Sequence, residues 1–236
     1  MKKFVAQCLF LFILYSIHTV AVAKVSPTAT TTTTPVPPAN PFPAMWRAHP
    51  FYIGTLVGYG STDWNQLIAH CDDPNFCLVS ASAPISAGDS GLVWGFYMGY
   101  EIQPYFALEL LYARFPNTTI TFDEFSIYAF DYGVTQMSSF TYAYSISGKW
   151  MVQMGSTGLR GFATAGATLT HRHDTLTNVY HVNPTFGIGT NYVFPSRILL
   201  EIAFQYYAGY GKATLRPAID YIPFLYSITA RLAYRI

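Results

Sequence analysis

The sequence predicts an all-β fold: an eight-stranded, antiparallel, up-and-down transmembrane β-barrel of a bacterial outer membrane. Hydrophobic residues make up 51% and charged residues 11% of the 236 residues, whereas a soluble domain carries roughly 25% charge. Beyond the N-terminal segment no apolar run is long enough for a membrane helix, so only a closed barrel could cross a bilayer. The 19 Tyr and 18 Phe are typical of the aromatic girdles of such barrels.

The first 50 residues are expected to lie outside the barrel. Residues 1–23 combine a charged start, an apolar run from Phe4 to Tyr15 and the end Ala21-Val22-Ala23, which are the three parts of a secretory signal peptide. The apolar run is too short for a membrane anchor. Residues 24–50 are rich in Thr and Pro and show no period, which predicts an extended linker. The barrel is therefore expected over residues 51–236.

Eight stretches of about ten residues alternate large apolar side chains with small or polar ones, which is the period of a β-strand. The stretches are 51–60, 92–101, 105–114, 138–150, 159–171, 183–193, 197–207 and 225–236. In a membrane barrel the apolar face points to lipid and the other face fills the lumen. Pairing Gly99 with Glu109 keeps both faces of one hairpin in register. A soluble lipocalin-like barrel would need the opposite assignment and would leave glycine-rich outer faces.

The connections between these stretches alternate in length. Short connections are expected at 102–104, near 151–158 and at 194–196, and longer ones at 61–91, 115–137, 172–182 and 208–224. Outer-membrane barrels have short periplasmic turns and longer external loops. Both termini are therefore expected on the periplasmic side.

Several short motifs, taken in order, resemble the outer-membrane β-barrel superfamily that includes the OmpA transmembrane domain and the opacity-type surface proteins. The motifs are Phe51-Tyr52-Ile53-Gly54 with Gly58-Tyr59-Gly60, Ala107-Leu108-Glu109-Leu110-Leu111-Tyr112, Pro184-Thr185-Phe186-Gly187-Ile188-Gly189 and Leu200-Glu201-Ile202. The resemblance covers residues 51–236. It implies an integral outer-membrane protein with membrane lipid, lipopolysaccharide and the barrel-assembly machinery as partners. The last residues, Tyr234-Arg235-Ile236, lack the terminal aromatic that this machinery usually reads.

Six charged residues fall on the faces assigned to the lumen. They are Glu101, Glu109, Lys149, Arg160, Glu201 and Arg231. Buried charges are tolerated only when paired, so a salt-bridge network that plugs the lumen is expected. A structural core is the preferred interpretation, and a gate for small ions is the alternative.

Two further groups of residues are candidates for chemistry. His171, His173 and His181 lie near the outer end of the fifth strand, where a His-x-His spacing puts two imidazoles on one face, as in metal sites. An exposed polar loop is preferred, so neither a metal nor a cofactor is predicted. Cys71 and Cys77 lie six apart in an exported chain, which favours a disulfide over free thiols or a zinc clip.

The net charge and the long loops limit the classes of function that the sequence supports. Without Lys2 and Lys3, 11 basic residues face 12 acidic ones, and the absence of a basic patch excludes nucleic acid as a partner. Loops on a rigid scaffold commonly carry binding, so we expect a structural or surface-interaction role in the cell envelope, with an unidentified extracellular ligand. A narrow porin and a lipid A-modifying enzyme are the alternatives. No Ser adjoins His171-Arg172-His173, so the chain is not predicted to be an enzyme.

Overall fold

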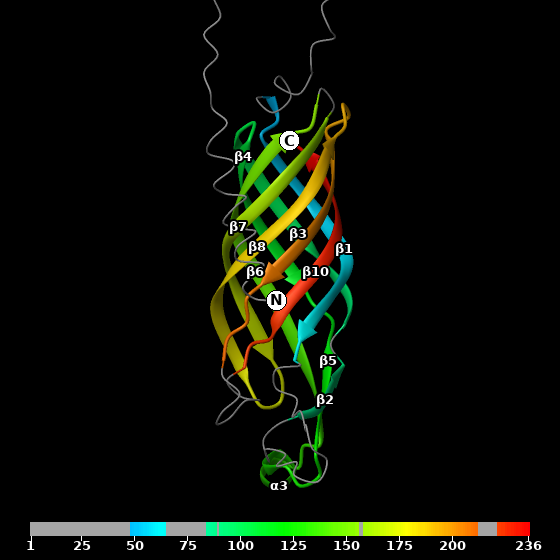
Figure 1. Cartoon of the computed structure of the whole chain (residues 1–236), viewed down its shortest axis with the longest axis vertical. Coiled ribbons are helices and arrows are strands. Elements are labelled where there is room, and N and C mark those ends of the chain that lie inside the picture. The colour runs from blue at the N-terminus through cyan, green and yellow to red at the C-terminus, as the bar shows by residue number, and fades with distance from the viewer. Residues whose placement is uncertain (1–47, 65–83, 89, 156–157, 212–220) are drawn as a thin grey trace, which may run out of the picture. The chain divides into compact units, whose positions relative to one another are not determined.

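The computed structural model describes residues 48–64, 84–88, 90–155, 158–211 and 221–236. In Figure 1 eight long strands close into an antiparallel barrel through the pairings β1–β10 and β6–β7. These strands are β1 (Phe51–Asp63), β3 (Ser90–Gln103), β4 (Phe106–Arg114), β6 (Gln136–Gln153), β7 (Leu159–His173), β8 (Asn178–Val193), β9 (Ile198–Tyr207) and β10 (Phe224–Arg235). The predicted eight-stranded barrel is confirmed. The predicted signal peptide, almost all of the linker, and Cys71 with Cys77 lie outside the described residues.

The register between strands fixes how steeply they tilt. From Val57 the residues directly opposite in the register across β3, β4, β6, β7 and β8 are, in order, Trp94, Arg114, Tyr142, His171 and Tyr180. In the other direction, across β10 and β9, the same row reaches Thr190 of β8. The row therefore meets β8 at Tyr180 in one direction and at Thr190 in the other. This offset of ten residues is the shear number of the barrel. With eight strands, this shear gives a tilt of about 40° at ordinary strand spacings.

The apolar faces point outward, as a membrane barrel requires. Phe96 is 54% exposed and Tyr100 is 51% exposed, whereas Glu109 is only 2% exposed. Gly99 pairs with Glu109, which confirms the predicted register of this hairpin. The lipocalin-like alternative is therefore wrong, because it would place these aromatic side chains inside the barrel.

Glycines make room for large side chains in the narrow interior. A Cβ atom on Gly99 would lie 2.2 Å from the ring of Tyr52, and one on Gly187 would lie 2.4 Å from Oε1 of Gln205. Inward-facing positions of small barrels must alternate small with large residues for this reason. The glycine-rich inner faces thus create the space for the polar interior described below.

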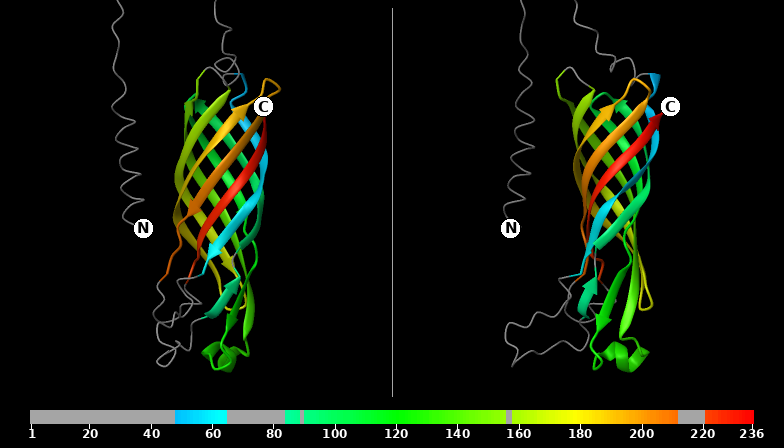
Figure 2. Two further views of the ribbon diagram at one scale, coloured as in Figure 1. Left: turned by 45° about the vertical axis from the view of Figure 1, so that its right-hand side comes forward. Right: turned by 90° about the vertical axis from the view of Figure 1, so that its right-hand side faces the viewer.

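Ordered structure continues beyond one end of the barrel, opposite to the start of β1 and the end of β10 (Figure 2). The first residues of β6 pair with β5 (Thr118–Phe122), which pairs in turn with β2 (Pro84–Gly88). The short helix α3 (Ile127–Tyr132) follows β5. In their described residues, the expected loops 61–91 and 115–137 therefore contain the strands β2 and β5 and the helix α3. No helix in the described ranges is long and apolar enough to cross a membrane.

The loop expected at 172–182 is wrong in its extent. β7 continues to His173 and β8 begins at Asn178, so only residues 174–177 form the turn. Asp174 shapes this turn, since its Oδ1 accepts hydrogen bonds from the backbone N–H groups of Leu176 and Thr177. The sequence pattern did not predict that β7 and β8 extend this far, because residues 172–182 contain no long run of alternating apolar side chains for a lipid face.

Candidate functional site in the lumen and at the far end of the barrel

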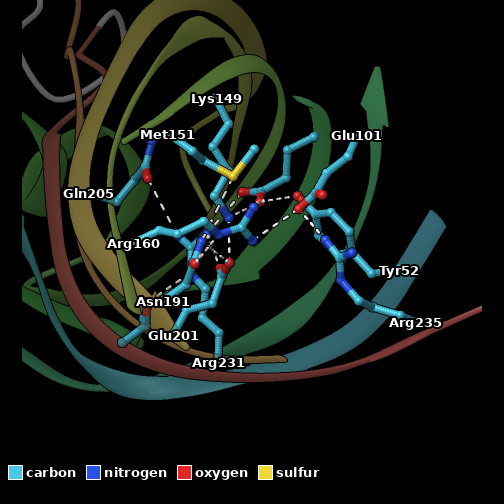
Figure 3. Close-up of polar contacts among 12 residues, drawn as sticks. Tyr52, Glu101, Lys149, Met151, Arg160, Asn191, Glu201, Gln205, Arg231 and Arg235 are labelled. Atoms are coloured by element: carbon cyan, nitrogen blue, oxygen red, sulfur yellow. Dashed lines mark hydrogen bonds and ion pairs between the residues drawn. The ribbon is translucent and has the colours of Figure 1, made fainter. Parts of the chain in front are cut away.

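Four charged side chains from four strands meet in the middle of the lumen. Lys149 of β6 donates to Oε2 of Glu109 at 3.1 Å and also pairs with Oε1 of Glu201. Arg231 of β10 donates through Nη1 to Oε1 of Glu109 at 2.9 Å. All four residues are at most 2% exposed. In Figure 3 the labelled Lys149, Glu201 and Arg231 point toward one another inside the barrel.

A second charged cluster lies closer to the barrel end that carries both described termini. Arg160 of β7 donates to Oε1 of Glu101 at 3.0 Å and through Nε to Oδ1 of Asn191 at 2.9 Å. Arg235 of β10 pairs with the same oxygen of Glu101. Each of these residues is 1% exposed or less. One carboxylate is therefore held by two guanidinium groups.

Neutral polar groups connect and support the two clusters. Tyr52 donates its hydroxyl to Oε2 of Glu109 at 3.1 Å, and Asn191 donates to Oε1 of Glu201 at 3.4 Å. Gln205 accepts from Arg231 and donates to Thr185. Each charged group thus has at least one partner, as a buried charge needs in order to be tolerated, while Oε2 of Glu101 and Oε2 of Glu201 accept no hydrogen bond within the described residues. The described interior is consequently filled by a connected set of polar side chains.

All six charged residues predicted from the sequence lie in these two clusters. Glu101 and Arg160 belong to the second cluster, and the other four form the first. The sequence reasoning missed Arg235, Tyr52, Asn191 and Gln205 as members. Arg235 lies on the inner face of its strand by the same alternation that identified Arg231, so the signal was present. A functional role for the network remains a prediction.

Aromatic side chains close the lumen on the other side of the charged clusters. Phe115 follows β4 and packs edge to face against Tyr207 of β9, with 5.6 Å between ring centroids. Both residues are 1% exposed. Edge-to-face packing at this separation is the favoured arrangement of aromatic pairs.

A small second core seals the far mouth of the barrel. We call it the cap cluster, and its members are Trp64, Ile120, Phe122, Tyr128, Met137 and Tyr221. Beneath it Arg172 lies 4.8 Å from the ring centroid of Trp64 and donates to the carboxylate of Asp174 at 2.7 Å. The Tyr221 hydroxyl donates to the backbone oxygen of Asp63 at 2.9 Å. Burial, with a further contribution from Asp63, raises the pKa of the Tyr221 phenol, so this residue stays a neutral donor.

Of the three candidate metal-binding histidines, His171 and His173 lie side by side with 6.2 Å between their ring centroids, whereas His181 lies apart from them. His171 pairs with Tyr180 on the outer face, whereas His181 pairs with Thr170, whose side chain is buried on the inner face. His171 hydrogen-bonds Asn178 and His181 hydrogen-bonds Asn183, at 2.7 and 2.8 Å. Among the described residues no group of three His, Cys, Asp or Glu side chains is arranged to hold a metal ion.

Exposed aromatic side chains gather at the tip beyond the cap cluster. Phe125, Phe130 and Tyr132 are 78%, 75% and 63% exposed. Ser126 caps α3 by accepting from Ala129 N–H, and Tyr128 anchors the helix in the cap cluster. The exposed rings are therefore held on an ordered support rather than on a free loop.

The closed barrel, its apolar outer face and its filled polar interior define an integral membrane protein of the β-barrel class. Residues 47–236 match the OmpA-like transmembrane domain, and the chain belongs to this family of outer-membrane proteins.

Solved structures of similar fold share little sequence with this chain. Neisserial surface protein A (NspA) is 12% identical with a TM-score of 0.49, over 79% of this chain and 97% of that chain. OprG from Pseudomonas aeruginosa is 12% identical with a TM-score of 0.49, over 80% and 97%. Ail of Yersinia pestis, in complex with the heparin analogue sucrose octasulfate, is 10% identical with a TM-score of 0.39, over 78% and 99%. No curated protein matches the chain.

Proposed function

We propose that this outer-membrane barrel is a surface-interaction protein of the cell envelope. In this proposal the tip beyond the cap cluster is external and both termini are periplasmic. The barrel and its charged interior act as the rigid structural support, without enzymatic activity. The observation that carries the proposal is the exposed trio Phe125, Phe130 and Tyr132 on an ordered base, because exposed apolar patches on ordered structure mark interaction sites.

The charges of the tip indicate the chemistry of the partner. Residues 115–137 contain Asp123, Glu124 and Asp131 and no Lys or Arg. A cationic partner surface with apolar side chains would complement this combination of carboxylates and aromatic rings. Aromatic side chains are also the residues that most often dominate binding energy at protein interfaces.

Adherence of cells that produce the full-length chain tests the proposal. Surfaces coated with fibronectin, collagen or a cationic amphipathic peptide are the probes. Phe125→Ser with Phe130→Ser should lower the number of retained cells by about tenfold or more, because truncation of anchor residues costs about 2 kcal/mol or more. The matched control is Tyr105→Ser, which removes an exposed ring from the turn between β3 and β4, at the opposite barrel end.

Two results would contradict the proposal. One is adherence to none of the three surfaces above the level of cells without the protein. The other is an equal loss for the tip variant and for Tyr105→Ser. Unboiled and boiled gel samples would verify that each variant forms the folded barrel.

A further inference from the structure

A continuous row of stacked side chains crosses the outer face of five strands. We call it the outer ladder, and its members are Trp94, Arg114, Tyr142, His171 and Tyr180, each directly opposite the next in the strand register. The Arg114 guanidinium carbon lies 6.0 Å from the Trp94 ring centroid and 5.8 Å from that of Tyr142. His171 stacks at 5.7 Å on Tyr142 and at 4.0 Å on Tyr180.

The outer ladder climbs toward the barrel end that carries the cap cluster. Because a row runs perpendicular to strands tilted by about 40°, each step rises by about 3 Å along the barrel axis. The ladder ends at Tyr180, two residues into β8, while the opposite direction of the same row descends to Thr190 near the end of β8. Arg114 is the last residue of β4. Its side chain can therefore extend from the lipid face toward the boundary of the membrane.

Arg114 lacks a carboxylate partner in the described part of the chain. The ion pairs found there all lie in the lumen or beneath the cap cluster. Of the Lys and Arg residues that the structure describes, only Arg114 and Arg197 are outside these buried sites. A guanidinium within about 6 Å of two rings is attracted to both of them and keeps N–H groups for bidentate recognition of phosphate.

We propose that the outer ladder is a binding site for a phosphate group on an outer-leaflet lipid. Arg114 donates hydrogen bonds to the phosphate oxygens. Trp94 and Tyr142 fix the plane of the guanidinium, and His171 with Tyr180 extend the stack beside the headgroup. A guanidinium on the lipid face of a barrel is costly in hydrocarbon and acceptable at the headgroup level, where lipid phosphate is the available counter-ion. The site lies in the outer leaflet only if the proposed orientation holds.

Native mass spectrometry of the full-length barrel in neutral detergent tests the binding itself, independently of orientation. The probes are diphosphorylated lipid A, a dephosphorylated lipid A of the same acylation, and inorganic phosphate. We expect wild type to retain diphosphorylated lipid A, and Arg114→Gln to weaken this binding by about tenfold. Arg197→Gln is the matched control, since among the described residues Arg197 carries the other guanidinium outside the buried clusters, and it should bind like wild type. Arg114→Lys should bind with intermediate affinity because it keeps charge without the planar donor edge.

Three results would overturn the inference. They are equal retention of dephosphorylated lipid A, equal losses for Arg114→Gln and Arg197→Gln, and displacement of lipid A by inorganic phosphate at an equal concentration. A heat-dependent gel shift shows whether each variant is folded. Failure of the adherence experiment would leave these results unchanged, so the two proposals are tested separately.

Discussion

At the scale of single residues, Glu109 is the carboxylate on which the first charged cluster of the lumen depends. Its two carboxylate oxygens accept hydrogen bonds from Tyr52, Lys149 and Arg231. A fully buried carboxylate is strongly disfavoured by desolvation, so its stability depends on these three donors together. The network is therefore more sensitive to loss of one member than to the balanced loss of a pair.

Glu109→Ala should lower the free energy of unfolding by about 3–5 kcal/mol, because it leaves Lys149 and Arg231 with one carboxylate between them. Arg231→Ala should have a cost of similar size. The double variant should cost at least about 1 kcal/mol less than the sum of the two single variants, since the second change removes a charge that the first left unpaired. Urea unfolding in lipid vesicles measures all three.

The control for this cycle is Glu124→Ala, which removes an exposed carboxylate from the tip. Surface substitutions of this kind usually change stability by less than about 0.5 kcal/mol. Additive costs for Glu109→Ala and Arg231→Ala would show that the two side chains do not stabilise each other.

At the scale of elements, β6 joins the membrane barrel to the structure beyond it. Its residues 140–153 pair with β7, and its residues 136–139 pair with β5. The cap cluster then attaches β5 and α3 to Trp64, which follows β1, and to Tyr221, which precedes β10. The tip is consequently fastened at several points rather than by one strand.

Trp64→Ala should release the tip without unfolding the barrel. The substitution removes a fully buried ring from the cap cluster and the aromatic partner of Arg172, a loss of about 3–5 kcal/mol in a packed core. We expect chymotrypsin to cleave near Phe125 and Phe130 at least about tenfold faster, because cleavage follows the population of the open form. The heat-dependent gel shift of the barrel should persist.

Trp150→Ala is the matched control for this experiment. The Trp150 ring is 50% exposed on the outer face, away from the cap cluster. Cleavage at the wild-type rate in Trp64→Ala, or equal acceleration by both substitutions, would exclude a fastening role for the cap cluster.

The strands of the barrel could be predicted because lipid imposes one periodicity on all of them. Every stretch with an apolar face of period two became a barrel strand, with ends within a few residues of the prediction. The same signal is absent from the structure at the far end, so β5, α3, the last two residues of β7 and the first five residues of β8 were missed. Their order comes from the cap cluster and from the Asp174 turn, which depend on contacts between distant segments.

At the scale of the whole molecule, the shear decides which lumen residues meet. Alternation along a strand places Glu109 and Arg231 inside, but they are 122 residues apart and come from β4 and β10. Their contact requires the strand number and the ten-residue shear together, because these set the height of every inward side chain. The sequence therefore predicted the members of the network and could not divide them into the cluster around Glu109 and the cluster around Glu101.

The same geometry stacks several barriers along one narrow axis. The Glu101 cluster, the Glu109 cluster, the Phe115–Tyr207 pair and Trp64 with Arg172 follow one another between the two mouths. A lumen of this diameter is filled by side chains in small barrels. A pore would need all four barriers to open together, which the mutual pairing of their side chains opposes.

Purified protein in a planar bilayer should therefore give no single-channel steps under conditions in which a general porin conducts. Arg231→Ala should be equally silent, because the Phe115–Tyr207 pair and the Glu101 cluster still fill the lumen. Regular conductance steps from the wild type would support the narrow-pore alternative instead. Steps from Arg231→Ala alone would identify the Glu109 cluster as the only effective barrier, contrary to the stacked arrangement of four.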